Sequence, residues 1–244
     1  MKDFEDAFGH ALQDNWQQAG GDLTVIERED GYVDVDYGTA SYFSEYEDWP
    51  SHQQEAMQYV VGRVIDIGCG AGRHALYLQR QGFQVLATDR SPLAIEVCKS
   101  RGLNQVRVLP ITQVSSRLGT FDTMLMLGNN FGLFGSFRRA KWLLRRFHGM
   151  TSARGRIIAE TLDPYQTENP DHLQYHQQNR ARGRAAGQVR IRVRYRKYIN
   201  PWMDYLLVSR DEVRQVLQGT GWAVSHFLDS DGPPYVAIID KIAW

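Results

Sequence analysis

A run of alternating glycines follows a short apolar segment of the chain. Val64–Ile67 has the composition of a buried strand, and Gly68–Gly72 follows it at once with the pattern Gly-Cys-Gly-Ala-Gly. Glycines at such a turn let the backbone approach a ligand without side-chain collision, and the next helix offers amide donors to an anionic group. The fingerprint of dinucleotide enzymes needs a glycine at position 73, which here is Arg73. The spacing predicts a ligand-binding turn and argues against a dinucleotide enzyme.

Two carboxylates accompany this turn. Asp66 precedes it, and Asp89 ends the next predicted strand, residues 83–88. A carboxylate at that strand end can accept hydrogen bonds from both hydroxyls of a ribose. Asp89 therefore predicts an adenosine-containing ligand, but nicotinamide enzymes also place an acid there, so it does not separate the two cofactor classes.

The end of the chain separates the cofactor classes more sharply. Residues 222–228 and 235–242 both have the composition of strands, and about six residues join them. So short a connection predicts an antiparallel pair. A doubly wound dinucleotide fold would place a crossover helix there.

The intervening segments must position these groups. We expect strands at 105–109, 121–127 and 156–161, and helices at 73–81, 91–102, 136–148 and 209–218. Strands that alternate with helices predict a parallel sheet with helices on both faces. Before this core, we expect an amphipathic helix from Phe4 through Trp16 to Gly20–Gly21, a hairpin of residues 23–26 and 32–37, and a helix that begins near Pro50.

Residues 58–244 resemble the class I S-adenosylmethionine-dependent methyltransferase family. The resemblance rests on residues 64–74, Asp89, residues 121–127 and the terminal hairpin. It implies an α/β fold with three α/β/α layers: a Rossmann-like, seven-stranded, mostly parallel sheet with a reversed last strand. A small β-containing insertion would follow the fifth strand.

The resemblance also implies S-adenosyl-L-methionine as cofactor and S-adenosyl-L-homocysteine as product. The glycine turn would lie under the methionine moiety, with Asp66 at its amino group, Arg73 at its carboxylate and Asp89 on the ribose. Residues 110–112 would border the adenine, although the aspartate that many relatives carry there is absent. The residues expected to bind the cofactor are Asp66, Gly68, Cys69 (through its backbone), Gly70, Gly72, Arg73, Asp89, Arg90, Ile111, Leu127, Asn129 and Tyr42.

Two adjacent amides follow the fourth strand of the core, where acceptor and cofactor meet in this fold. Asn129, Asn130 and Phe131 are therefore expected to bind the acceptor, although turn chemistry alone also explains the two amides. The segment only partly resembles the Asn-Pro-Pro-Phe motif of enzymes that methylate amino groups of bases, and both prolines are missing. We therefore do not expect this chain to methylate the amino groups of bases.

No catalytic side chain is singled out by the sequence. Methyl transfer from a sulfonium needs no protonation of the leaving group, so alignment, exclusion of water and removal of an acceptor proton are the protein's main tasks. The candidates for a base are His172, His176, Tyr165 and Glu160.

The chain is expected to form one domain, residues 1–244. Residues 1–57 would be an N-terminal cap, 58–162 and 209–244 the cofactor-binding core, and 163–208 a lid with strand-like runs at 188–198 and 203–208. Four arginines alternate with apolar residues in the first of these runs and should share one face of a strand: Arg190, Arg192, Arg194 and Arg196. That face is either solvated or an electropositive wall for an anionic acceptor or a nucleic acid.

Bulk properties restrict the function further. The 244 residues carry a formal net charge of zero and are 43% hydrophobic, which is ordinary globular composition and argues against a nucleic-acid partner. The acidic start is unlike a signal peptide, and no apolar run approaches the roughly 20 residues of a membrane span. Two cysteines, Cys69 and Cys98, fit a reducing cytoplasm. Asp34 and Asp36 alone make a poor metal site, so we expect no metal.

We therefore expect a methyltransferase for a small-molecule acceptor. The alternatives are a nucleic-acid or protein methyltransferase that uses residues 190–196, a non-catalytic S-adenosylmethionine-binding protein, and a nicotinamide enzyme. The sequence gives neither the acceptor, nor the atom that is methylated, nor the oligomeric state.

Overall fold

The computed structural model describes residues 1–18, 23–36 and 39–242. The chain divides into two compact units. The first comprises Met1–Trp49, Ile65–Gln113 and Arg190–Met203. The second comprises Pro50–Val64, Val114–Val189 and Asp204–Trp244.

Seven strands form the main sheet, in the order β11-β12-β7-β6-β3-β4-β5. They are β3 (Val64–Ile67), β4 (Val85–Asp89), β5 (Val106–Val108), β6 (Phe121–Met126), β7 (Thr151–Leu162), β11 (Trp222–Asp229) and β12 (Pro234–Lys241). β4 pairs with β5 and β6 with β7 in parallel, whereas β12 is antiparallel to both β7 and β11. The predicted fold class, including the reversed strand, is confirmed.

Helices of the first unit cover β4 and β5. α3 (Arg73–Arg80) begins at the glycine turn, and α4 (Pro92–Ser100) begins at Ser91, whose hydroxyl accepts a hydrogen bond from the amide of Ala94. α1 (Ala7–Trp16) packs against α4, and the carboxylate of Asp6 accepts a 2.8 Å hydrogen bond from Ser91 Oγ. Leu12 of α1 joins a core cluster with Ala71 of the turn, so the N-terminal segment is built onto the turn.

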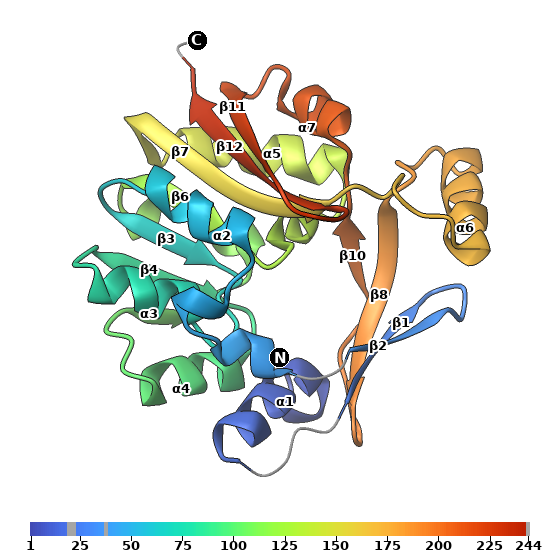
Figure 1. Cartoon of the computed structure of the whole chain (residues 1–244), viewed down its shortest axis with the longest axis horizontal. Coiled ribbons are helices and arrows are strands. Elements are labelled where there is room, and N and C mark those ends of the chain that lie inside the picture. Colours follow the sequence, from blue (N-terminus) through green and yellow to red (C-terminus); the bar gives the residue numbers. More distant parts are fainter. Residues whose placement is uncertain (19–22, 37–38, 243–244) are drawn as a thin grey trace. The chain divides into compact units, whose positions relative to one another are not determined.

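A second sheet has the order β10-β8-β1-β2, with β9 paired to β8. Its strands are β1 (Thr24–Arg28), β2 (Val33–Asp36), β8 (Gln188–Tyr195), β9 (Tyr198–Ile199) and β10 (Met203–Leu206). The hairpin of β1 and β2 and the two predicted strands of the insertion are thus confirmed in the described residues. Figure 1 shows β8 running beside β1.

Arg192 and Arg194 of β8 both bind Glu27 on β1. Nε and Nη2 of Arg192 lie 2.8 and 2.9 Å from the two oxygens of Glu27, and Nε of Arg194 lies 2.5 Å from Oε2. The placement of Arg196 on the same strand face is wrong, because β8 ends at Tyr195 and Arg196 occupies the following turn with φ 50°. The turn directs its guanidinium to Asp14 on α1, 2.7 Å away.

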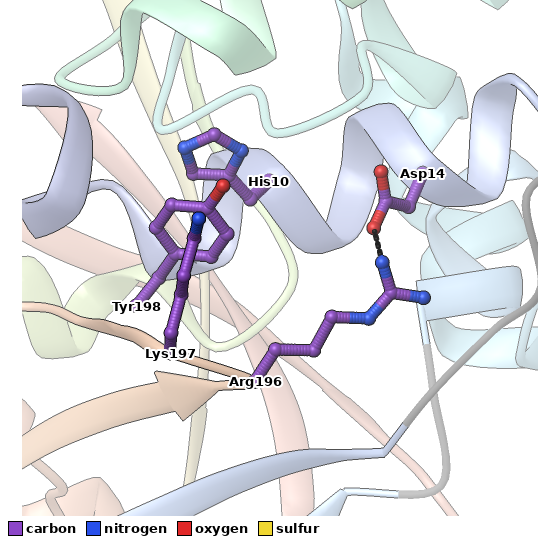
Figure 2. Close-up of a pocket in the computed structure, with 5 residues that line it drawn as sticks. All are labelled: His10, Asp14, Arg196, Lys197 and Tyr198. Carbon is purple, nitrogen blue, oxygen red and sulfur yellow. Dashed lines mark hydrogen bonds and ion pairs between the residues drawn. The ribbon is translucent and has the colours of Figure 1, made fainter.

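The same turn borders a pocket of about 310 Å³ (Figure 2). The ring of His10 stacks on that of Tyr198, with centroids 3.5 Å apart, and Lys197 lies over the Tyr198 ring. His10 also contacts Asp3, and Asp14 pairs with Arg196. These contacts hold β9 against α1. Because Asp3 and Asp14 lie beside His10 and Arg196, the pocket does not favour a ligand of either charge.

In the second unit, helices pack on β7, β11 and β12. α2 (Ser51–Ala56) contacts β11 and β12, and α5 (Phe137–His148) contacts β7 and α7 (Arg210–Leu217). Figure 1 shows α2 and α5 on opposite faces of these strands. α7 begins with a capping box in which Ser209 and Glu212 bond each other's backbone amides, as the sequence around Ser209 predicts.

Several observed helices and strands differ from the predicted ones in their bounds, and one was not predicted. α6 (Pro170–Ala181) was not predicted, and β7 begins at Thr151 rather than at residue 156. α1 ends at Trp16, and both Trp16 and Phe4 are exposed rather than on a buried face. The predicted helix end at Gly20–Gly21 and the strand end at Tyr37 lie outside the described residues.

Within the described part of the chain, no helix is long and apolar enough to cross a membrane. The same residues contain no group of three or more His, Cys, Asp or Glu side chains that could hold a metal ion.

Candidate functional site

The glycine turn requires glycine for two separate reasons. Gly68, Gly70 and Gly72 have φ values of 78°, 54° and 79°, which is the left-handed region that other residues adopt only at a cost. A β-carbon on Gly72 would also lie 2.6 Å from Leu103 Cδ1, and one on Gly70 would lie 3.2 Å from the ring of Tyr42. The turn is therefore close-packed on one side by Tyr42, which the sequence predicts as a cofactor contact.

Asp89 ties the end of β4 to this turn. Its Oδ2 accepts a 3.0 Å hydrogen bond from the amide of Gly70, and its Oδ1 accepts one of 2.9 Å from the amide of Ser91. Burial raises the pKa of this carboxyl, although the two amide bonds act to lower it. Each carboxylate oxygen can accept a second hydrogen bond. Asp89 can therefore hold the turn and two ribose hydroxyls together.

Asp66 lies beside the turn with an unsatisfied oxygen. Its side chain is 1% exposed, and Oδ2 has no hydrogen-bond partner among the residues that the structure describes. Burial, and then the charge of Asp89, raise the pKa of Asp66 to about 7. A buried carboxylate oxygen without a partner is costly, so a cationic group beside it would be stabilised. This feature fits the amino group of S-adenosyl-L-methionine.

Arg73 and Arg90 make their contacts within the first unit. Nη1 of Arg73 donates to Ser41 O and Ser44 Oγ at 2.9 and 3.0 Å. The guanidinium of Arg90 lies near the sulfur atoms of Met1 and Met203. Arg73 thus binds the N-terminal segment to the first turn of α3.

Cys69 and Ile111 complete the predicted residues of this unit. Cys69 is buried with Sγ 3.8 Å from Sγ of Cys98, and its pKa is raised by the Cys98 thiol and by burial. A thiol with a raised pKa is a weak nucleophile. Ile111 lies half-buried in a short 3-10 helix, Ile111–Gln113.

The predicted acceptor residues lie in the second unit, directly after β6. Leu127 is buried, and Gly128 and Asn129 follow with φ values of 73° and 64°. Asn129 Oδ1 is buried without a hydrogen-bond partner among the described residues. A 3-10 helix, Asn130–Phe134, comes next, and the fully buried ring of Phe131 packs edge-on against Phe134, with centroids 5.0 Å apart.

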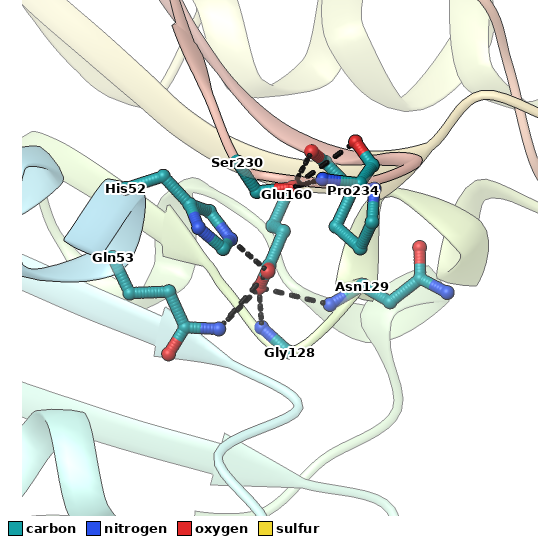
Figure 3. Close-up of polar contacts among 8 residues, drawn as sticks. His52, Gln53, Gly128, Asn129, Glu160, Ser230 and Pro234 are labelled. Atoms are coloured by element: carbon teal, nitrogen blue, oxygen red, sulfur yellow. Dashed lines mark hydrogen bonds and ion pairs between the residues drawn. The ribbon is translucent and has the colours of Figure 1, made fainter. Parts of the chain in front are cut away.

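Glu160, near the end of β7, is the centre of a polar cluster (Figure 3). Its carboxylate accepts from His52 Nε2 at 2.8 Å, Gln53 Nε2 at 2.8 Å, and the amides of Gly128 and Asn129 at 2.5 and 3.2 Å. Burial acts to raise the pKa of Glu160, but the hydrogen bonds, led by that from His52, hold it below its ordinary value. A carboxylate with so many donors takes a proton reluctantly.

Sequence reasoning missed two members of this cluster. His52 and Gln53 lie 108 and 107 residues from Glu160 along the chain, and nothing in their local sequence marks them. The detectable signal was Glu160 itself, a single acid that follows the apolar residues Ile157–Ala159 of a buried strand.

The other base candidates have partners of their own. Tyr165 donates to Glu212 at 2.8 Å, and burial followed by this bond raises the pKa of Tyr165 to about 12. Nδ1 of His172 lies 3.2 Å from Thr167 Oγ1, and His176 is buried in α6. A phenol with that pKa and a nearby carboxylate acceptor is a poor base at neutral pH.

Comparison with known proteins agrees with this geometry. Residues 64–155 match a protein family described as a methyltransferase domain. Residues 64–155 therefore form a methyltransferase domain. The family predicted from the glycine turn, Asp89 and the terminal hairpin is confirmed.

Solved structures share the fold over all or most of this chain. An S-adenosylmethionine-dependent methyltransferase from Bacteroides fragilis, in complex with S-adenosyl-L-homocysteine, superposes with a TM-score of 0.84 at 23% identity and covers 100% of this chain and 98% of its own. An amino pentose methyltransferase from Micromonospora echinaspora has a TM-score of 0.57 at 14% identity and covers 83% and 95%. At these identities the likeness shows the fold alone.

Curated relatives match part of the chain. A glycine/sarcosine N-methyltransferase of Halorhodospira halochloris is 27% identical over 161 residues, which is 59% of each chain. A glycine/sarcosine/dimethylglycine N-methyltransferase of Actinopolyspora halophila is 24% identical over 161 residues, and the chain covers 28% of it. The chain thus spans less than two thirds of the length of these relatives.

Proposed function

We propose that this chain transfers a methyl group from S-adenosyl-L-methionine to a small-molecule acceptor. The observation that carries the proposal is the buried oxygen of Asp66, which has no hydrogen-bond partner among the described residues and lies beside the turn of Gly68, Gly70 and Gly72. A nucleoside derivative with a cationic amino group, such as S-adenosyl-L-methionine, would satisfy that oxygen, whereas NAD and NADP carry no ammonium group. Asp89 supplies acceptors for the ribose hydroxyls.

The residues predicted from the sequence are retained as proposed cofactor ligands. Asp66 would bind the amino group of the cofactor and Asp89 its ribose. Arg73 would donate N–H groups of its guanidinium, which has five, to the carboxylate of the cofactor. Tyr42 would contact the cofactor next to Gly70, which its ring already touches. The remaining proposed ligands are Gly68, Cys69, Gly70, Gly72, Arg90, Ile111, Leu127 and Asn129.

When bound, the cofactor supplies an electrophilic methyl group on a sulfonium, whose sulfur leaves as a neutral thioether. The acceptor atom must therefore be aligned and must hold a free lone pair. No protein group has to protonate the leaving sulfur.

We propose that the acceptor atom is the nitrogen of a small amine. The curated relatives, all named as N-methyltransferases of glycine or its methylated forms, support this choice. Asn129, Asn130 and Phe131 remain the proposed acceptor residues. Oδ1 of Asn129, which lacks a partner in the described part of the chain, could accept an N–H of the amine and so orient its lone pair.

We also propose that residues 1–244 act as one domain, with residues 1–57 as a cap and 163–208 as a lid. The contacts of Tyr205 on β10 support the lid, since its hydroxyl donates to Asn129 O at 2.5 Å and its ring occupies the space beside Gly132. A strand at the end of the insertion is thereby joined to the proposed acceptor residues.

Two free buried thiols, Cys69 and Cys98, are compatible with a cytoplasmic location.

The test is a methyl-transfer assay with purified chain, S-adenosyl-L-methionine and single acceptors. Glycine, sarcosine, an amino sugar and a set of hydroxy acids of similar size would be compared by the S-adenosyl-L-homocysteine produced. We expect turnover with at least one amine and none with its hydroxyl analogue. Turnover with oligonucleotides or a protein substrate, and with no amine, would contradict the small-amine proposal.

A further inference from the structure

We infer that Glu160 is a positioning residue, which fixes the backbone of Asn129 and so the direction of its side chain. The inference rests on the proposed function, because it takes Asn129 as a residue of the acceptor site. It replaces the sequence-based hypothesis that Glu160 is a base.

The contacts of Glu160 lie on two sides of the carboxylate. His52 and Gln53 of α2 donate from one side, and the amides of Gly128 and Asn129 donate from the other (Figure 3). The side chain is 5% exposed, so solvent does not compete for these bonds. The carboxylate thereby joins α2 to the end of β6.

The backbone that Glu160 holds has an uncommon conformation. Gly128 and Asn129 are consecutive residues with positive φ, and asparagine tolerates this region better than most non-glycine residues. Two successive amides directed at one point form an anion-binding concavity. Here Oε2 of Glu160 occupies that concavity, and its bond to the Asn129 amide offsets the cost of the left-handed conformation of Asn129.

Asn129 is fixed on its carbonyl side as well. Its backbone carbonyl oxygen accepts a hydrogen bond from the Tyr205 hydroxyl, while its backbone amide donates to Glu160. Figure 3 shows the Asn129 side chain directed away from the carboxylate. Both backbone polar groups are thus held in place, and the side-chain oxygen without a partner in the described chain is left for a ligand.

His52 has the arrangement of a support rather than of a proton carrier. Nε2 faces Glu160, and Nδ1 is buried without a partner among the described residues. Because the carboxylate only accepts, Nε2 carries the proton in this pair. Gln53 adds a second donor that bridges both carboxylate oxygens at 3.0 and 2.8 Å.

The test compares Glu160→Gln and Glu160→Ala in the full chain. A glutamine keeps one oxygen for the Gly128 amide, and His52 and Gln53 can turn acceptors toward its NH₂ group, so it should partly rescue the loop. Alanine removes every acceptor. We expect the acceptor KM of the alanine variant to rise about tenfold or more, with the glutamine variant between it and wild type. The affinity for S-adenosyl-L-homocysteine, for which Asn129 is one of several proposed ligands, should fall by less than the acceptor KM rises.

Asp240→Asn is the matched control. Asp240 of β12, the strand next to β7, pairs with Arg156 and is not among the hydrogen-bond partners of Glu160 given above. We expect it to lower stability and to leave KM and kcat unchanged. A similar loss of activity in this variant would mean that the effect of Glu160 is one of stability only, which overturns the inference.

An amide spectrum separates the inference from the proposed function. In a ¹H–¹⁵N correlation spectrum of the wild-type chain, the amide protons of Gly128 and Asn129 should resonate downfield, because they are hydrogen-bonded to a carboxylate. In Glu160→Ala they should lose that downfield shift, and this result does not require a known acceptor. Absence of turnover with these shifts present would reject only the acceptor proposal. Unchanged amide positions in the folded variant would reject the positioning role.

Discussion

The amide of Gly70 donates to the carboxylate of Asp89 across 3.0 Å. The same carboxylate accepts from Ser91, where α4 begins. The turn after β3 and the end of β4 are therefore held by one side chain. A residue proposed to bind ribose thus also sets the shape of the turn that is proposed to lie beneath the methionine moiety.

Replacement of Asp89 tests this double role. Asp89→Ala removes the acceptors for the ribose hydroxyls and the anchor of Gly70, so we expect S-adenosyl-L-homocysteine to bind more weakly by about 1.5–3 kcal/mol. Calorimetry measures the loss. Glu96→Ala, an exposed acid on α4, is the control and should bind as wild type. Equal affinities of both variants would reject the assignment of Asp89.

Gly72→Ala tests the close packing of the turn. The new β-carbon would meet Leu103 and Cys98 at 2.6 and 3.0 Å, in a backbone with φ 79°. Gly82→Ala is matched in φ, at 88°, but its β-carbon meets nothing within 4 Å. We expect Gly82→Ala to cost about 1 kcal/mol in the free energy of unfolding and Gly72→Ala more, with loss of cofactor binding only in the second. Urea unfolding and calorimetry give both values, and equal effects would contradict the packing argument.

Asp66 predicts a pH dependence of cofactor binding. Its pKa in the folded chain is raised to about 7 by burial and by Asp89, above the value of about 3.9 of an unfolded chain. Its contribution to stability is therefore greatest below pH 4 and is lost as pH rises through about 7. A ligand ammonium group favours the ionised carboxyl, so binding should strengthen as pH rises from 5.5 to 7.5 and release a proton.

Calorimetry in buffers of different ionisation enthalpy counts the proton that binding releases. Asp66→Asn should bind S-adenosyl-L-homocysteine more weakly at pH 7.5 and show a flatter pH profile over the same interval. A profile identical to that of the wild-type chain would remove Asp66 from the amino-group site.

The arginine strand gives a prediction about acid stability. Hydrogen bonds from Arg192, and then from Arg194, lower the pKa of Glu27 to about 2. A lowered pKa contributes stability above the ordinary range of glutamate, and this stability is lost as pH falls toward 2. Arg192→Gln with Arg194→Gln should therefore flatten the loss of unfolding free energy between pH 4.5 and 2.5.

The same double variant tests the electropositive wall. Because Glu27 neutralises part of the arginine face, we expect the acceptor KM and its salt dependence to stay as in wild type. A raised KM with a weaker salt dependence would show instead that the arginines attract an anionic acceptor.

Sequence alone predicted the elements whose signal is local. The apolar strand Val64–Ile67, the glycine turn after it and the helix that begins at residue 91 each depend on a few neighbouring residues, and each prediction is confirmed. α6 was missed because most of its residues are polar and its few apolar ones give no helical period. Asn169 and Pro170, which cap that helix and begin it, were the available signal.

The cluster around Glu160 could not be predicted in the same way. Its donors come from α2 and from the residues after β6, and only the folded second unit brings them to one carboxylate. The misplacement of Arg196 has a similar origin, because the alternating pattern continues through Tyr195 while the backbone turns at Arg196. Periodicity describes a strand but not the residue at which it ends.

The most direct test of the account is calorimetric titration of the full chain with S-adenosyl-L-homocysteine, beside a titration with NADH. The turn at Gly68–Gly72, Asp66 and Asp89 predict binding of the first ligand in the low micromolar range, which corresponds to about 8 kcal/mol, and no heat with the second. Absence of heat and of any thermal shift at millimolar S-adenosyl-L-homocysteine, or binding of NADH instead, would contradict the central claim.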